Sequence, residues 1–108
     1  MTKIKTFRPT GIFDNIKVLE FRDDLIKSLT RGDVQTVLID FAGITFMDSA
    51  GLGSLVLLLK TVRSYSATMY LCNVNPQIQM LFELTNMDRV FEIFGTQTDF
   101  LESQKPSQ

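Results

Sequence analysis

The chain has 108 residues, a hydrophobic content of 44% and a formal net charge of −1, which together predict one globular domain around a single core. It contains no histidine and one cysteine, which excludes Ser-His-Asp and Cys-His catalysis, an intramolecular disulfide and a multi-cysteine metal cluster. The near-neutral charge and the scattered Lys and Arg residues exclude a basic surface of the kind that binds nucleic acid.

The first elements in chain order are a strand and a helix. Residues 3–8 alternate weakly and predict an edge strand. Thr10 and Gly11 predict a turn, after which Asp14 or Asn15 is expected to cap a helix. The inner face of this helix is predicted from apolar residues at helical spacing: Val18, Leu19, Leu25, Ile26 and Leu29. Arg31 and Gly32 are expected to end it, with a cation near the negative end of the helix dipole and a glycine stop.

The second half of the chain alternates between strands and helices. Residues 34–41 form a near-continuous apolar run, which is typical of a strand covered on both faces. A short loop then leads to a strongly apolar helix from Ser49 to about Ser64, and residues 69–74 predict the next strand. Asn75 and Pro76 predict the start of another helix, which Asn86 ends in a left-handed conformation. Residues 91–94 predict a last short strand and residues 98–102 a final helical turn.

This alternation predicts an α/β fold with a single-layer, mainly parallel (mixed) sheet of four to five strands and packed helices. The core is expected to span residues 3–101, followed by a polar tail at 102–108. Residues 1–5 lack an apolar signal region, and the longest apolar stretch, 52–59, is far shorter than the ~20 residues that span a bilayer. We therefore expect a cytoplasmic protein without membrane insertion, and a buried thiol at Cys72.

The most informative stretch is the strand-to-helix corner Asp48-Ser49-Ala50-Gly51-Leu52-Gly53. Asp48 or Ser49 is expected to cap the helix, but capping does not explain two glycines early in a helix, each unfavourable by ~1 kcal/mol relative to alanine. We interpret the small residues as leaving the backbone around Ser49 open to an incoming surface. The corner lacks the third glycine of a dinucleotide fingerprint and the Gly-Lys-Ser/Thr of a P-loop.

Catalysis by Ser49 is not expected. The corner does not read Gly-x-Ser-x-Gly, no histidine is available as a base, and Lys60 lies eleven residues away along the helix. A phosphate on Ser49 would instead be stabilised by the unpaired amides of the first helical turn, and opposed by Asp48. Because a phosphoserine adds about −1.5 to −2 charges, the corner favours a regulatory phosphorylation site.

The helix after the corner also predicts a docking surface. Leu52, Leu55, Val56, Leu59 and Val62 are expected to face the sheet, which places Leu57 and Leu58 on the flanks. Neighbouring helices could cover these two leucines. If exposed, they would form an apolar patch beside Ser49, as a protein interface requires.

These residues resemble those of the STAS domain, and within it the small anti-sigma factor antagonists of bacteria. The resemblance extends from about Lys3 to Leu101, and its most specific element is the Asp-Ser-x-Gly-Leu-Gly motif between a strand and a helix. Supporting elements are Thr10-Gly11 with Asp14, Asp40-Phe41, residues 44–53, residues 71–76 and residues 81–85.

The resemblance implies a phosphorylation-controlled partner switch and no enzymatic activity or cofactor. The implied acceptor is Ser49, phosphorylated by an anti-sigma factor with serine kinase activity and dephosphorylated by a metal-dependent serine phosphatase. The unphosphorylated form would bind the kinase and free a sigma factor. The partner-binding residues implied near the docking surface are Asp14, Asp48, Gly51, Leu52, Ser54 and Leu57.

The sequence departs from the family in three ways. Ala50 replaces a second hydroxyl, Asn86 replaces a common glycine, and little chain precedes residue 3, so the sheet is expected to be one strand short at an edge. The alternative function is a constitutive STAS module, for example a subunit of a lipid-transport or transporter assembly, without a phosphate cycle.

Overall fold

The computed structural model describes residues 3–105, and their elements alternate as the sequence predicts. The strands are β1 (Ile4–Phe7), β2 (Thr10–Phe13), β3 (Thr36–Asp40), β4 (Gly43–Met47), β5 (Thr68–Cys72) and β6 (Glu92–Phe94). The helices are α1 (Asn15–Thr30), α2 (Ser49–Ser64), α3 (Pro76–Leu84), the short 3₁₀ helix η1 (Met87–Arg89) and α4 (Gln97–Ser103). Residues 106–108 of the predicted polar tail lie outside the described part.

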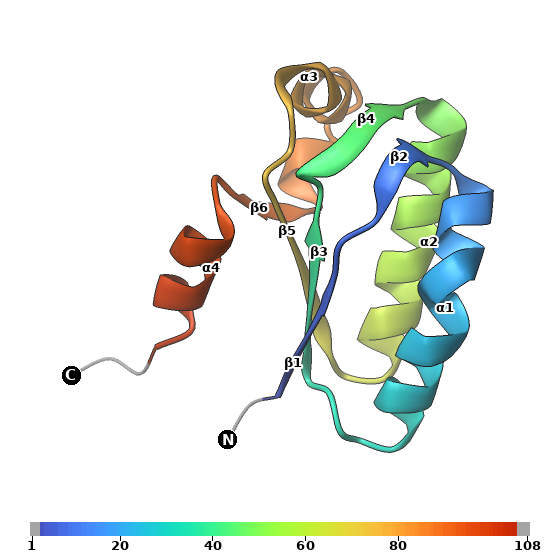
Figure 1. Ribbon diagram of the computed structural model, residues 1–108, viewed down its shortest axis with the longest axis vertical. Coiled ribbons are helices and arrows are strands. Elements are labelled where there is room, and N and C mark those ends of the chain that lie inside the picture. Colours follow the sequence, from blue (N-terminus) through green and yellow to red (C-terminus); the bar gives the residue numbers. More distant parts are fainter. Residues whose placement is uncertain (1–2, 106–108) are drawn as a thin grey trace.

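The main sheet has four parallel strands in the order β1-β3-β5-β6. Its register aligns Phe7 with Ile39, Ile39 with Leu71 and Leu71 with Ile93, so one row of apolar side chains runs across the whole sheet. Helices α1 and α2 lie together on one face of this sheet, whereas α4 lies on the other side (Figure 1). The predicted α/β fold with a parallel sheet is confirmed.

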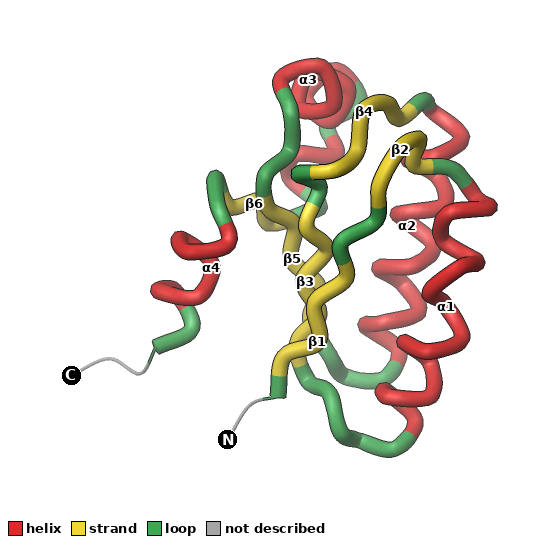
Figure 2. The backbone as a smooth tube through the Cα atoms, viewed as in Figure 1, coloured by secondary structure: helices red, strands yellow, loops and turns green. Residues whose placement is uncertain are grey.

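A second sheet of two parallel strands, β2 and β4, was not predicted (Figure 2). The turn expected at Thr10 and Gly11 is therefore wrong, as is the loop expected between the strand at 34–41 and the helix that begins at Ser49. β1 pairs with β3 in the main sheet. The chain bends after each of these strands, and the next strands, β2 and β4, pair with each other in the second sheet. The register of this pair skips Thr45, so the strict alternation that identifies a strand in a sequence is broken.

The helix starts follow the predicted capping chemistry. Asp14 caps α1 by accepting from the Lys17 amide, and Asp48 caps α2 by accepting from the Gly51 amide, both at 2.9 Å. Asn75 caps α3 and Thr96 caps α4 in the same way. The choice left open by the sequence is thus resolved in favour of Asp14 over Asn15, and of Asp48 over Ser49.

The inner faces of α1 and α2 differ in part from the predicted stripes. On α1, Leu19 is 54% exposed rather than buried. On α2, Leu58 is buried because α1 packs along it, whereas Leu57 remains 64% exposed. Residues on which prediction and structure agree are buried in the core: Val18, Leu25, Leu29, Leu52, Leu55, Leu59 and Val62.

The far side of the sheet is covered by α4, the one helix that the structure describes there (Figure 1). Phe100 of α4 is fully buried and packs against Tyr70 and Phe94, with ring centroids 5.3 and 5.6 Å away. Together these rings cover Leu38 and Cys72 of the central strands. The helical turn predicted at residues 98–102 is therefore a helix with a core of its own.

Among residues 3–105, no helix combines the length and the apolar character needed to cross a bilayer.

Candidate functional site

Ser49 is exposed and occupies the first position of α2, directly after the cap residue Asp48. The carboxylate of Asp48 accepts from the amide of Gly51, and its carbonyl accepts from the amide of Leu52, each at 2.9 Å. These bonds leave the amides of Ser49 and Ala50 as the first-turn donors without an intrahelical acceptor. A negatively charged group on the Ser49 hydroxyl would lie next to these donors and to the positive end of the helix dipole.

The two glycines of the corner have different roles. A Cβ at Gly51 would lie 2.2 Å from the carbonyl oxygen of Phe13 and 2.9 Å from the Met47 side chain. The interpretation of Gly51 as an opening for a partner is therefore wrong, because its missing side chain allows α2 to start directly against β2. At Gly53 an added Cβ meets no described heavy atom within 4 Å, so here the bare backbone remains accessible from outside.

The structure brings the starts of α1 and α2 together. Phe13 and Met47 are register partners at the ends of the parallel strands β2 and β4, and Asp14 and Asp48 follow them directly. The strand pairing therefore places two acidic caps side by side, with Ser49 next to one of them. Asp14 is half-buried and Asp48 is exposed.

A shallow groove of about 140 Å³ runs between α1 and α2. From α2 it is lined by Ser54 and Leu57, two of the predicted partner-binding residues. From α1 it is lined by Asn15, Leu19 and Arg22, which sequence reasoning did not assign to a site. The sequence contains no signal that marks Leu19 as a surface residue, because its spacing is that of a core residue. Only its position beside the groove identifies it as part of a site.

The remaining predicted partner-binding residues face inward. Gly51 is buried and Leu52 is only 6% exposed, so neither presents a side chain to a partner. Their contribution is to the shape of the corner, whereas Asp48, Ser49, Ser54 and Leu57 are placed where a second protein can reach them.

A buried carboxylate fixes the bend that leads into β4. Asp40, at the end of β3, accepts from the amide of Ala42 at 2.9 Å and from the side-chain amide of Asn73 at 3.0 Å. Arg8 lies 3.5 Å from its other oxygen and donates to Gln97 of α4 at 2.8 Å. Asp40 thus joins the carboxyl ends of neighbouring strands and helps to set the direction in which β4 carries the chain to Ser49.

Cys72 lies beside this carboxylate and is fully buried. Burial raises the pKa of its thiol from 9.0 to about 11, and the charge of Asp40 and a hydrogen bond to it act in the same direction, partly offset by Arg8. At neutral pH the thiol is therefore protonated and is not a nucleophile.

We expect Cys72 in the native protein to react with iodoacetamide at pH 8 at least about 100-fold more slowly than in the unfolded protein, because both burial and the raised pKa suppress the thiolate. The rate should rise with pH up to about 11. Mass spectrometry of timed samples measures it, with the protein in 6 M guanidinium chloride as the control. Equal rates in the two states would contradict a buried thiol.

No cluster of three or more His, Cys, Asp or Glu side chains that could hold a metal ion occurs within residues 3–105.

Comparison with known proteins identifies the family to which the chain belongs. The family model of the STAS domain matches residues 2–99, and the chain belongs to this family. The anti-sigma F factor antagonist of Paenibacillus polymyxa is 22% identical over 94 residues, which cover 87% of this chain and 80% of that protein.

Two solved structures of SpoIIAA have the same fold. The structure of the anti-sigma factor antagonist SpoIIAA in its unphosphorylated form superposes with a TM-score of 0.70 at 18% identity and covers 96% of this chain and 90% of that one. The phosphorylated form of the Bacillus cell fate determinant SpoIIAA gives a TM-score of 0.72 at 19% identity, covering 97% and 94% of the two chains.

Proposed function

We propose that this protein is an anti-sigma factor antagonist and that phosphorylation of Ser49 controls its binding to an anti-sigma factor. The observation that carries the proposal is the exposed hydroxyl of Ser49 at the amide-rich start of α2. Family membership supports it, as do the relatives named anti-sigma factor antagonists, of which SpoIIAA has been solved with and without its phosphate.

The proposed chemistry is a phosphoryl transfer between two partner enzymes. An anti-sigma factor with serine kinase activity transfers the γ-phosphoryl group of ATP to the Ser49 oxygen, which loses its proton, and ADP leaves. A metal-dependent serine phosphatase then hydrolyses the ester with water and releases inorganic phosphate. The antagonist supplies only the acceptor, which is consistent with the lack of a histidine anywhere in the chain.

The switch acts through charge rather than through a change of fold. The amides of Ser49 and Ala50 and the helix dipole favour a phosphate at this position, so α2 is expected to stay folded. The neighbouring acidic caps, Asp14 and Asp48, already make this end of the molecule negative. A phosphate adds about −1.5 to −2 charges. It would therefore repel any surface that fits the neutral hydroxyl beside Ser54 and Leu57, or raise the desolvation cost of binding it.

Incubation with the cognate kinase and ATP is expected to add one phosphate to the protein, and Ser49→Ala is expected to abolish the addition. Intact-mass spectrometry shows the gain of about 80 Da. Ser64→Ala, a change of another exposed serine at the opposite end of the same helix, is the matched control and should be phosphorylated normally. Phosphate on the Ser49→Ala protein would refute the assignment of the site.

The charge-based switch has its own test in Ser49→Asp, which is expected to weaken binding to the kinase by about tenfold or more. The melting temperature should change by no more than about 2 °C. Thr98→Asp puts the same charge into the first turn of α4, on the far side of the molecule, and should bind normally. A large loss of stability in Ser49→Asp would indicate a structural role for the hydroxyl.

A further inference from the structure

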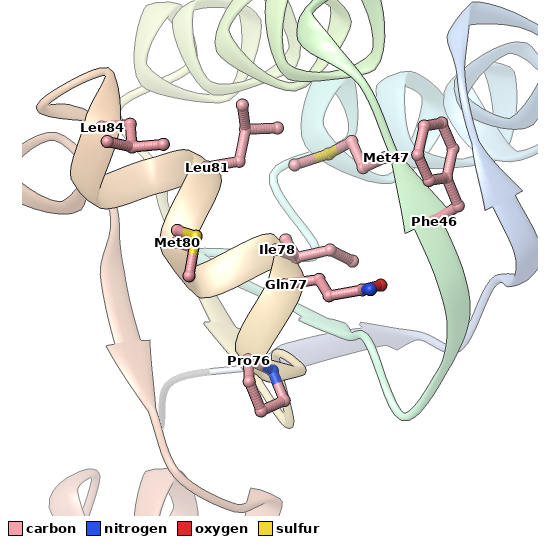
Figure 3. A pocket seen from close by; sticks show the side chains of 8 residues that line it. All are labelled: Phe46, Met47, Pro76, Gln77, Ile78, Met80, Leu81 and Leu84. Atoms are coloured by element: carbon pink, nitrogen blue, oxygen red, sulfur yellow. The ribbon is translucent and has the colours of Figure 1, made fainter.

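A groove of about 450 Å³ lies between β4 and α3. Apart from Gln77, it is lined by apolar side chains of both elements: Phe46, Met47, Pro76, Ile78, Met80, Leu81 and Leu84. Figure 3 shows Met47 extending from β4 toward Leu81 of α3, with Ile78 beside them. Met47 and Ile78 are buried and form the floor, whereas Phe46, Met80 and Leu84 are 51%, 60% and 76% exposed and form the rim.

Helix α3 is apolar on two faces. Ile78 and Phe82 are buried in the core, which accounts for one face. A second stripe at spacing i, i+1 and i+4 consists of Met80, Leu81 and Leu84. Met80 and Leu84 of this stripe are exposed. A helix with apolar residues on both sides is typical of one that is covered on both sides. The groove face of α3 therefore has the composition of an interface.

The charged residues near the walls of the groove are mainly acidic. Neither β4 nor α3 contains a Lys or an Arg. The charged residues next to these two elements are Glu83 on α3, Asp48 directly after Met47, and Asp88 and Arg89 of η1, which packs against α3, so three of the four are acidic. An apolar surface with an acidic border is complementary to an apolar surface bordered by basic side chains.

The geometry points to the β4–α3 groove as the docking site for an amphipathic helix of a partner protein, apolar on the side that enters the groove and bordered by Lys or Arg. Helix α3 is 9 residues long, about 14 Å, so it can lie along some two and a half turns of such a helix. Two of the seven apolar residues that line the groove are methionines, which adapt to irregular apolar partners. This docking goes beyond the proposed phosphorylation of Ser49 and does not depend on it.

The probe is a synthetic peptide of about four helical turns with leucines on one helical face and lysines elsewhere. It is titrated into the ¹⁵N-labelled full chain and followed by NMR. We expect saturable shifts of amides within residues 43–48 and 76–84. The double variant Met80→Gln/Leu84→Gln, which changes only exposed side chains, should bind about tenfold more weakly or worse.

Three controls isolate the features that carry the inference. A peptide with glutamate in place of every lysine should bind at least about tenfold more weakly. Leu101→Gln removes an exposed apolar side chain from α4 and should bind the lysine peptide normally. Ser49→Ala should also bind it normally, which separates this docking from the phosphorylation switch.

Several results would overturn the inference. Shifts confined to α1 and α2, or spread over the whole surface, would place the peptide elsewhere. Concentration-dependent shifts of the groove amides without peptide would identify a second copy of this chain as the occupant. Shifts of the same amides with decanoate, but not with peptide, would identify a small apolar ligand instead. Equal binding of the lysine and glutamate peptides would show that charge does not contribute to docking, and would contradict a partner helix bordered by Lys or Arg.

Discussion

Replacing Gly51 by alanine is expected to lower the free energy of unfolding by about 3 kcal/mol. The new Cβ would lie 2.2 Å from a backbone oxygen, that of Phe13, and 2.9 Å from the Met47 side chain. The side chain can move, but the peptide of Phe13 is held in the β2–β4 pairing, so α2 itself must shift away from β2. Urea denaturation with an unchanged m-value would measure the loss.

Gly53→Ala is the matched control, because it makes the same change two residues later on the same helix. Here the added Cβ meets no neighbouring atom. The free energy of unfolding is therefore expected to rise by about 1 kcal/mol, because alanine has a higher helix propensity than glycine. A similar loss of stability in both variants would contradict this explanation, because the contact with Phe13 exists only at residue 51. If partner approach needs the bare backbone at residue 53, this more stable variant should also be phosphorylated more slowly.

Asp40→Ala is expected to lower the free energy of unfolding by about 3 kcal/mol. It removes the acceptor of the Ala42 amide and of the Asn73 side chain, and both hydrogen bonds are partly buried. Since these contacts fix the bend before β4, amides of residues 43–47 should also exchange with solvent faster than in the unmodified protein. Chemical denaturation and hydrogen exchange measure the two effects.

Asp40→Asn retains one oxygen and is expected to lose only about 1 kcal/mol. Asp33→Ala, which changes an exposed carboxylate in the loop before β3, should stay within about 0.5 kcal/mol. A loss in Asp40→Asn as large as in Asp40→Ala would assign the effect to the charge facing Arg8 instead of to the hydrogen bonds.

The main sheet and its helices could be predicted because their signals are local. An apolar run such as residues 36–40, and a cap such as Asp14 or Asn75, depend on a few neighbouring residues. The second sheet could not be predicted in this way. Strand β4 has a bulge opposite Gly11 and Ile12, and its pairing with β2 joins residues more than thirty positions apart. Only tertiary contact makes Thr10 and Gly11 part of a strand.

The candidate site was predicted in its chemistry but not in its shape. The exposed serine after an aspartate cap is a local pattern, and the structure places Ser49 as that pattern requires. The explanation of Gly51 depended on Phe13, which belongs to another element and could not be inferred from spacing. In the same way, burial of Leu58 but not of Leu57 depends on how α1 packs along α2, and a helical repeat alone does not fix that packing.

The position of α4 has a consequence for synthesis on the ribosome. Leu38 and Cys72 lie in β3 and β5, yet their cover, Phe100, is the latest of the large buried side chains to be translated. A chain that has been synthesised only as far as Gly95 contains all four strands of the main sheet but lacks α4, so the apolar side around Leu38 and Cys72 has no cover. Until α4, a helix of seven residues, has formed, chaperones or other unfinished copies can compete with it for the same surface.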